Sequence, residues 1–257
     1  MAGLTSVARS AGDRTRLAVL ALLLALAGIA WVTTAARMDG MASGPGMYPE
    51  DLGFYVSAWV VMMAAMMFPS VWPTVALYAR MQRDRRERGL GWSGGAAAAF
   101  VGGYVLTWAA AGLAGFALLA AVRSLGADGL AWERSGHWVA AAVIGLAAAY
   151  ELTPLKDTCL GRCRSPLGFL VSGWRDGRAG ALRMGAAHGG WCVGCCWALM
   201  AALFALGLMS LAWMLVIAVF IAVEKLLPWR AAATAAVTVA LLGLGIAVAA
   251  APGAFMG

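Results

Sequence analysis

Long apolar stretches constrain what this chain can fold into more than any other feature. A helix that crosses a bilayer needs about 20 mostly apolar residues. The sequence has such stretches at residues 17–35, 54–78, 95–121, 137–155, 184–207, 211–227 and 231–251. None alternates in the manner of a membrane β-strand. We therefore expect an all-α, polytopic transmembrane helical bundle of about seven spans, with residues 1–257 forming a single domain.

The composition excludes several other classes of protein. Hydrophobic residues make up 63% of the chain and charged residues 12%, against about 45–50% and about 25% in soluble domains. A soluble protein this apolar would have too few polar residues to cover its surface. The composition therefore excludes soluble globular and disordered proteins. The net charge of +7 comes from the segments that connect the apolar stretches. We therefore expect the chain to interact with the lipid bilayer and not with nucleic acid.

The charges of the connecting segments predict the orientation. Lysine and arginine accumulate in alternate connections, whereas the connections between them balance their arginines with acidic residues. The basic segments are residues 9–16, 80–88, 156–183 and 225–230, and the balanced ones are residues 37–51 and 123–134. Because basic loops stay inside, we expect a cytoplasmic N-terminus and a multi-pass protein of the bacterial inner (plasma) membrane.

The first stretch has an alternative interpretation as a secretory signal, because it follows a basic segment and ends in small residues. Its apolar region of about 19 residues exceeds the core of about 7–15 residues in signal peptides. We therefore favour an uncleaved anchor. Cleavage would leave six spans and would not alter the orientation of the others.

The fifth stretch carries the strongest chemical signal. His188, Cys192, Cys195 and Cys196 fall within an arc of about 100° on a helix, the width of one face. An imidazole and three thiols on one face form a surface suited to a soft metal ion. The alternative is that the cysteines pack as small hydrophobic residues. Gly189, Gly190 and Gly194 would allow a neighbouring helix to approach closely.

The second stretch adds thioethers at a similar depth. Met62 lies one turn from Met66, and Met63 lies one turn from Met67. Thioethers suit Cu(I), although methionine is also an ordinary filler of cores. The prolines at positions 69 and 73 should kink this helix. We expect the methionines to approach the cysteines of the fifth stretch.

A third group lies towards the cytoplasmic edge. Glu151 and Glu224 end the fourth and sixth stretches, and Cys159 and Cys163 follow in what we expect to be a loop. These residues are further candidate ligands. The alternative is ion pairing, for example of Glu151 with Lys156, with Glu224 reaching water. We expect both loop cysteines to be thiols, since the cytoplasm is reducing, and the short apolar segment 166–174 to lie in the membrane interface.

Together, these motifs resemble a bacterial family of predicted metal-binding integral membrane proteins, whose members carry a domain of unknown function. Four stretches carry the resemblance. They are Trp59–Ser70 with its paired methionines, Tyr150–Pro166 (YELTPLKDTCLGRCRSP), Cys192–Met200 (CVGCCWALM) and Gly207–Lys225. The resemblance implies a multi-span protein that binds metal and handles copper.

The sequence therefore predicts a membrane protein that binds Cu(I) and acts in copper transport, delivery to a cuproenzyme, or sensing. A copper chaperone or a cuproenzyme is the expected protein partner, and a role without catalysis is favoured. Two alternatives stay open: a membrane thiol–disulfide oxidoreductase that uses Cys192 and Cys195, and an assembly subunit without metal. The predicted ligands are Cys192, Cys195, Cys196, His188, Met62, Met63, Met66, Met67, Cys159, Cys163, Glu151 and Glu224.

Overall fold

The structure is a computed structural model that describes residues 2–38, 51–90, 93–124, 135–207 and 210–255. Helices and their connections account for these residues, and no strand occurs among them. The helices are α1 (Ala2–Met38), α2 (Leu52–Glu87), α3 (Ala96–Ser124), α4 (His137–Glu151), α5 (Pro154–Cys163), α6 (Pro166–Ser172), α7 (Gly177–Leu206), α8 (Leu211–Leu226), α9 (Arg230–Ala250) and the short 3-10 helix η3 (Pro252–Phe255). The all-α prediction is confirmed.

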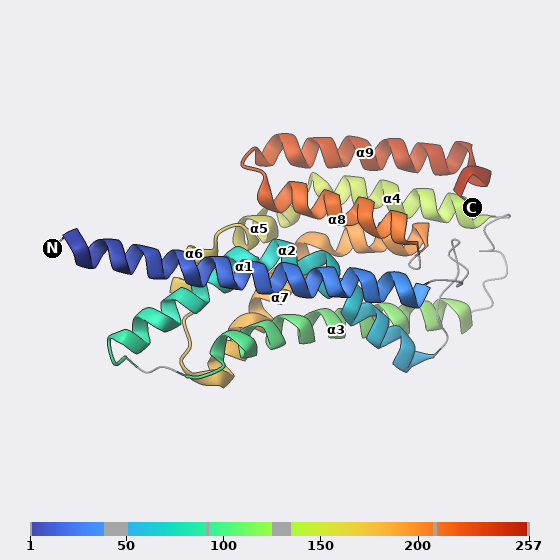
Figure 1. The fold of residues 1–257 in the computed structure, drawn as a ribbon. Helices are drawn as coiled ribbons and strands as arrows, with labels where there is room; N and C mark the ends of the chain where they lie inside the picture. The colour runs from blue at the N-terminus through green and yellow to red at the C-terminus, as the bar shows by residue number, and fades with distance from the viewer. Residues whose placement is uncertain (1, 39–50, 91–92, 125–134, 208–209, 256–257) are drawn as a thin grey trace.

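The long helices lie side by side in one bundle (Figure 1). Five helices, α1, α2, α3, α7 and α9, are long and apolar enough to cross a membrane, and the bent pair α4 and α5 is a sixth candidate. The sixth stretch forms α8, which has 16 residues. Helix α1 begins at the end of the bundle that holds α5 and α6, and α9 ends at the opposite end (Figure 1). The lengths and apolar character of these helices are compatible with a membrane protein.

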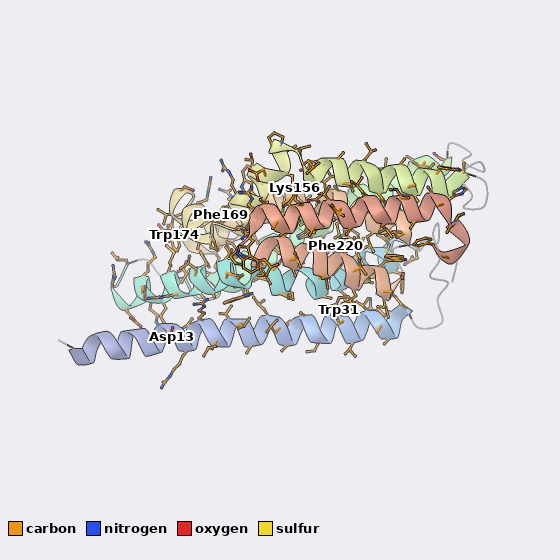
Figure 2. All side chains as sticks on the ribbon, turned by 90° about the horizontal axis from the view of Figure 1, so that it is seen from above. Asp13, Trp31, Lys156, Phe169, Trp174 and Phe220 are labelled. Carbon is orange, nitrogen blue, oxygen red and sulfur yellow. The ribbon has the colours of Figure 1, made fainter. Side chains whose placement is uncertain are left out.

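The surface and the interior are arranged as a bilayer requires. Large apolar side chains are exposed along the outer helices: Leu146 on α4 is 70% exposed and Ile246 on α9 is 69% exposed. Charged side chains such as Lys156 and Glu224 are instead buried between the helices. In the view from above, Phe169 and Trp174 lie towards the end where α1 begins (Figure 2). Apolar groups therefore lie on the outside of the bundle, while polar groups meet inside it.

The fourth predicted span, residues 137–155, is broken into two helices. Helix α4 ends at Glu151, and α5 starts at Pro154 after a bend of 69°. Proline lacks an amide hydrogen and disfavours helical geometry in the preceding residue. Thr153 is accordingly extended, and its hydroxyl caps α5 by accepting a hydrogen bond from the Lys156 amide at 3.2 Å. The chain therefore folds back into the bundle at this point.

Helices α3 and α7 pack at backbone contact because glycines line their interface. A Cβ atom built on Gly185 would lie 1.8 Å from the Phe100 carbonyl oxygen, and one on Gly103 would lie 2.0 Å from the Leu182 carbonyl oxygen. A side chain at either position would collide with main chain. This contact fixes the position of α3, and with it Tyr104, against the face of α7 that carries the cysteines.

Helix α2 continues through Pro69 and Pro73 as one helix from Leu52 to Glu87. The Ser70 hydroxyl donates a hydrogen bond to the Met67 carbonyl oxygen at 2.9 Å, close to the first proline. Trp59 anchors α2 on α3, since its indole N–H donates to the Trp108 carbonyl oxygen at 2.7 Å. The methionine segment is therefore part of one long helix packed inside the bundle.

Candidate metal centre

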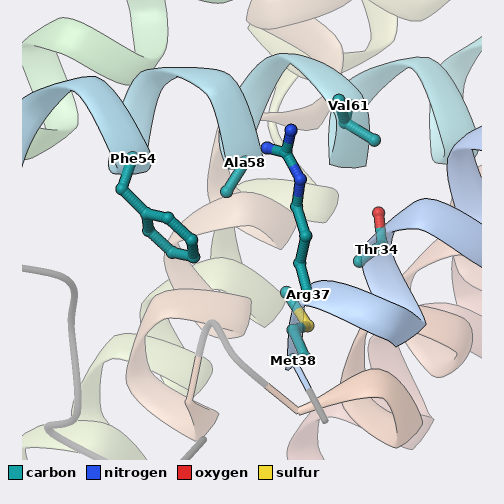
Figure 3. Close-up of a pocket in the computed structure, with 6 residues that line it drawn as sticks. All are labelled: Thr34, Arg37, Met38, Phe54, Ala58 and Val61. Atoms are coloured by element: carbon teal, nitrogen blue, oxygen red, sulfur yellow. The ribbon is translucent and has the colours of Figure 1, made fainter.

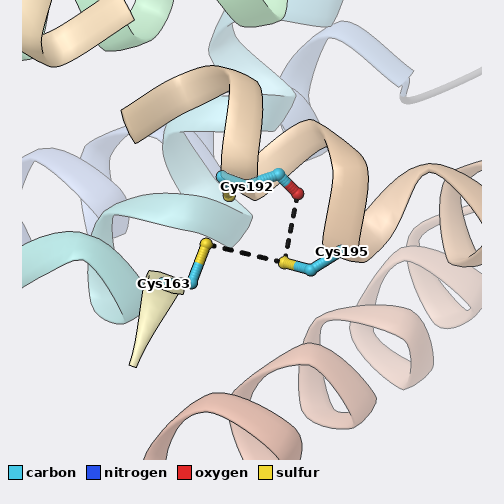
Figure 4. A group of neighbouring side chains, drawn as sticks. All are labelled: Cys163, Cys192 and Cys195. Atoms are coloured by element: carbon cyan, nitrogen blue, oxygen red, sulfur yellow. Dashed lines mark hydrogen bonds between the residues drawn. The ribbon is translucent and has the colours of Figure 1, made fainter. Parts of the chain in front are cut away.

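Three cysteine sulfur atoms meet inside the bundle. The Sγ atoms of Cys163, Cys192 and Cys195 all lie within 4.8 Å of one another, and Figure 4 shows them facing a common point. The sulfur of Cys195 lies 3.8 Å from that of Cys163 and donates to the Cys192 carbonyl oxygen at 3.2 Å. Cys192 and Cys195 are each 1% exposed, whereas Cys163 is partly exposed. We call this set the three-thiol group.

The three-thiol group is built from two helices. Helix α7 supplies Cys192 and Cys195, which are three residues apart and so share a face, and α5 supplies Cys163. We expected Cys163 in a loop. That expectation was wrong, because Pro154 and the Thr153 cap start a new helix that carries the residue back to α7.

A glycine on α7 gives α5 room to approach. A Cβ atom on Gly194 would lie 2.9 Å from the sulfur of Cys159, so α5 rests directly on this glycine. The Tyr150 hydroxyl at the end of α4 donates to the Gly194 carbonyl oxygen at 2.6 Å. Gly189 also contacts a neighbouring helix, as expected, but Gly190 faces open space. Gly194 is thus the position in the cysteine motif that sets the distance between the two helices.

Charged groups fix the other side of α5 to α8 and α9. The Lys156 ammonium lies 2.8 Å from the Glu224 carboxylate. Arg164 donates to the Glu224 carbonyl oxygen at 2.6 Å, and Arg230 of α9 pairs with Asp157. Because Cys163 lies on the same short helix, these contacts hold its thiol in place.

The sulfur of Cys192 has two polar neighbours. The Lys225 ammonium donates to it at 2.9 Å, and the Tyr104 hydroxyl lies 3.0 Å away. An ammonium has only donors, so the sulfur accepts, and a positive charge in a buried site stabilises the negative charge of a thiolate. The ammonium therefore favours the thiolate form of Cys192, which is the form in which a cysteine can bind metal.

The comparison with protein families agrees with this geometry. Residues 56–248 match the model of the PpoB2 family, which is described as a copper chaperone family. The matched residues run from the first turns of α2 almost to the end of α9. The chain belongs to this copper chaperone family. No curated protein and no solved structure matches the chain.

The other thiols of this copper chaperone family member lie beside the three-thiol group. The Cys196 sulfur is 3.3 Å from the Cys195 sulfur. The Cys159 sulfur lies against Gly194, and the Cys159 residue is 5% exposed. All five cysteines of the chain are free thiols. Their ligand roles remain predictions.

His188 lies one turn before Cys192 on α7 but is not part of the three-thiol group. Its ring packs 5.0 Å from Phe169 of α6 and 6.0 Å from Tyr104 of α3, measured between centroids. The imidazole is 3% exposed, and its Nδ1 atom has no hydrogen-bond partner among the described residues. Tyr104 therefore contacts both the His188 ring and the Cys192 sulfur. Phe169 also shows that segment 166–174, expected in the interface, packs partly into the bundle.

The four candidate methionines of α2, which are Met62, Met63, Met66 and Met67, are at most 3% exposed and belong to the same contiguous core as the cysteines. They therefore do not face lipid. Their role as ligands remains a prediction. A small pocket between α1 and α2, lined by residues such as Arg37 and Phe54 (Figure 3), contains no thiol, so it offers no soft-metal ligand beyond the thioether of Met38.

The two candidate carboxylates meet at one lysine. The Lys156 ammonium lies 2.5 Å from a Glu151 oxygen and 2.8 Å from a Glu224 oxygen. The alternative of a Glu151–Lys156 ion pair is what the structure shows, and Glu224 joins that ammonium instead of reaching water. Sequence reasoning missed Tyr104 and the contact of Lys225 with Cys192. The only available signal was that both residues are polar groups in or beside apolar stretches.

Proposed function

We propose that this chain is a membrane copper chaperone that holds Cu(I) on the sulfur atoms of Cys163, Cys192 and Cys195 and passes it to a protein acceptor. The observation that supports this proposal is the convergence of three thiols within 4.8 Å in the bundle. Thiolates prefer soft cations such as Cu(I). In a low-dielectric site, metal and thiolates also neutralise each other.

Exchange of the copper ion would take place at Cys163. This residue is the partly exposed member of the group, while Cys192 and Cys195 are fully buried. An acceptor thiol can therefore reach the metal from the side of α5 without opening α7. A copper chaperone or a cuproenzyme with a soft-metal site is the class of partner that fits.

We further propose that the chain crosses a bacterial inner membrane seven times, with α8 as a span and with the N-terminus in the cytoplasm. The basic segments support this orientation. Helices α5 and α6 lie at the end of the bundle where α1 begins (Figure 1). In this orientation, Cys163 exchanges copper on the cytoplasmic side.

The buried methionines supply a direction for the movement of copper in this proposal. Thioethers are neutral and hold Cu(I) less tightly than thiolates do. Copper that first binds Met62 and Met66, or their neighbours on α2, would move downhill in free energy to Cys192 and Cys195. Cys196, Cys159 and His188 would then support this transfer from the edge of the three-thiol group.

The experiment that tests the proposal is the copper content of the purified protein. The parent, purified in mild detergent under reducing conditions and reconstituted with Cu(I), should retain copper. Cys163→Ser and the double variant Cys192→Ser/Cys195→Ser should lose most of it. Cys159→Ser is the matched control, because this cysteine shares helix α5 with Cys163 but lies outside the three-thiol group.

Other outcomes identify the alternatives. A parent that binds no Cu(I) but forms a Cys192–Cys195 disulfide with an oxidised thiol protein would indicate the oxidoreductase. A parent with neither property would indicate the assembly subunit. Retention of full copper content by the double serine variant would refute the proposed site.

A further inference from the structure

Helix α7 carries a row of soft-metal ligands that extends beyond the three-thiol group in both directions. Thioether, imidazole and thiol side chains recur at every fourth position of the helix: Met184, His188, Cys192, Cys196 and Met200. Their relative exposures are 2%, 3%, 1%, 1% and 4% in that order, so all five are buried. We call these five residues the α7 ligand row.

The spacing of the α7 ligand row makes each member a neighbour of the next. Residues four positions apart on a helix have Cβ atoms about 5–6 Å from each other. Each such step advances about 6 Å along the helix axis and turns by about 40°. The four steps from Met184 to Met200 therefore cover about 24 Å, which is most of the hydrocarbon thickness of a bilayer, about 30 Å.

The row stays inside the bundle although it winds around α7. The sulfur of Met184 accepts a hydrogen bond from the main-chain amide of Arg175 at 3.2 Å, at the connection between α6 and α7. His188 packs on Phe169 of α6, and the Cys192 sulfur meets groups from α5, α3 and α8. Different helices thus cover successive members, so a metal ion on the row would be surrounded by protein.

His188 gives a second observation that points to a ligand. Its Nδ1 atom has no hydrogen-bond partner among the described residues, and the residue is 3% exposed. A buried polar atom without a partner costs free energy, whereas a neutral imidazole nitrogen is a common metal ligand. His188 lies one turn from Cys192, so a metal ion that moves between these two residues would satisfy the imidazole.

We propose that the α7 ligand row is a relay through which Cu(I) crosses the bilayer, with the three-thiol group as its resting point. The relay rests on the proposed copper function and adds movement across the membrane to it. A bare cation is very costly in hydrocarbon. Because successive ligands are one turn apart, the next ligand can bind the ion before the previous one leaves.

Each step of the relay forms one bond between copper and a ligand and breaks another, and the ion stays Cu(I) throughout. Thioethers hold Cu(I) less tightly than thiolates do. Met184 and Met200 are therefore the positions at which the ion enters or leaves the row. Delivery to a protein acceptor through Cys163 starts from the same resting point.

Uptake of Cu(I) into liposomes tests this proposal. The full chain is reconstituted in phospholipid vesicles that enclose a chromogenic Cu(I) chelator, and Cu(I) is added outside under reducing conditions. Vesicles with the parent should take up Cu(I) faster than protein-free vesicles. Met184→Leu, His188→Leu and Met200→Leu should each remove most of this uptake, since each replaces a ligand of the row with a side chain that cannot bind copper.

The copper content of the same variants separates movement from binding. In detergent, the three row variants should retain as much Cu(I) as the parent, because the three-thiol group is intact in each. Met38→Leu is the matched control, since it makes the same change at a buried methionine of α1, 8% exposed. This control should transport Cu(I) as fast as the parent. Exchange of methionine for leucine is well tolerated in cores.

Two results would overturn the relay alone. In one, the parent retains Cu(I) in detergent but its vesicles take up no more than protein-free vesicles. In the other, the row variants transport Cu(I) as fast as the parent. A parent that binds no Cu(I) in detergent overturns the proposed copper site and the relay with it. If His188→Leu does not fold, the two methionine variants decide the question.

Discussion

The Lys225 ammonium lies 2.9 Å from the sulfur of Cys192 inside the bundle. The two residues belong to α8 and α7 and are 33 positions apart in the chain. A buried ammonium against a sulfur atom is favourable when that sulfur is a thiolate, because the two charges then neutralise each other. The contact therefore favours the thiolate form of Cys192, and in the proposed copper site this residue would be deprotonated before copper arrives.

Replacement of Lys225 should change the number of protons released on copper binding. Thiols must lose their protons to bind metal. In the parent, the Lys225 ammonium should hold Cys192 as a thiolate, whereas in Lys225→Met Cys192 should be a neutral thiol. The variant should therefore release about one more proton per Cu(I) bound, measured with a pH indicator in weak buffer. Lys225→Arg keeps the charge and should match the parent, and an equal count in Lys225→Met would contradict the preformed thiolate.

Enlargement of Gly194 should separate α5 from α7. A Cβ atom there would lie 2.9 Å from the Cys159 sulfur, whereas one on Gly190 would meet nothing within 4 Å. Gly194→Leu should therefore move Cys163 away from Cys195 and lower the Cu(I) affinity of the protein while its helix content stays the same. Gly190→Leu, on the exposed side of the same helix, is the control. Equal Cu(I) affinities in a competition titration with a chromogenic chelator would show that Gly194 does not set this distance.

The contact between α3 and α7 should be intolerant of even one methyl group. Gly185→Ala would place a Cβ atom 1.8 Å from a main-chain oxygen. Overpacking of this kind costs about 1–3 kcal/mol. Gly102→Ala on α3, where nothing lies within 4 Å, should be neutral or stabilising. Thermal unfolding in detergent measures the difference, and equal midpoints for the two variants would refute the close contact.

The proposed orientation predicts which positions a membrane-impermeant thiol reagent reaches in intact cells. Asp51, the N-cap of α2, should lie outside, and Arg83 near the other end of the same helix should lie in the cytoplasm. Asp51→Cys should therefore be labelled and Arg83→Cys should not, with the parent as the background control. The reverse pattern would overturn the positive-inside assignment.

Most of the fold followed from the sequence because apolar length and helix formation are local properties. Each predicted stretch corresponds to a helix, and the bounds differ by only a few residues at most helix ends. The main difference is the fourth stretch. A hydropathy pattern runs smoothly across Glu151 and Thr153, but the geometry of Pro154 breaks the helix there.

The site was predicted in part. The arc on α7 correctly put Cys192 and Cys195 on a common face, because side-chain direction follows helical period. Sequence periodicity could not place Cys163, whose position depends on the 69° bend. It also could not pair Lys225 with Cys192, since that contact depends on how two helices rotate against each other. Such tertiary contacts have no signal within a single stretch.

The central claim is that copper is bound by sulfur atoms from two helices. X-ray absorption at the copper edge of the Cu(I)-loaded parent tests it most directly. The account predicts a Cu(I) edge and a shell of three sulfur neighbours, from Cys163, Cys192 and Cys195, which falls to two in Cys163→Ser and stays at three in Cys159→Ser. A first shell of nitrogen or oxygen, or a sulfur shell that does not change in Cys163→Ser, would contradict it.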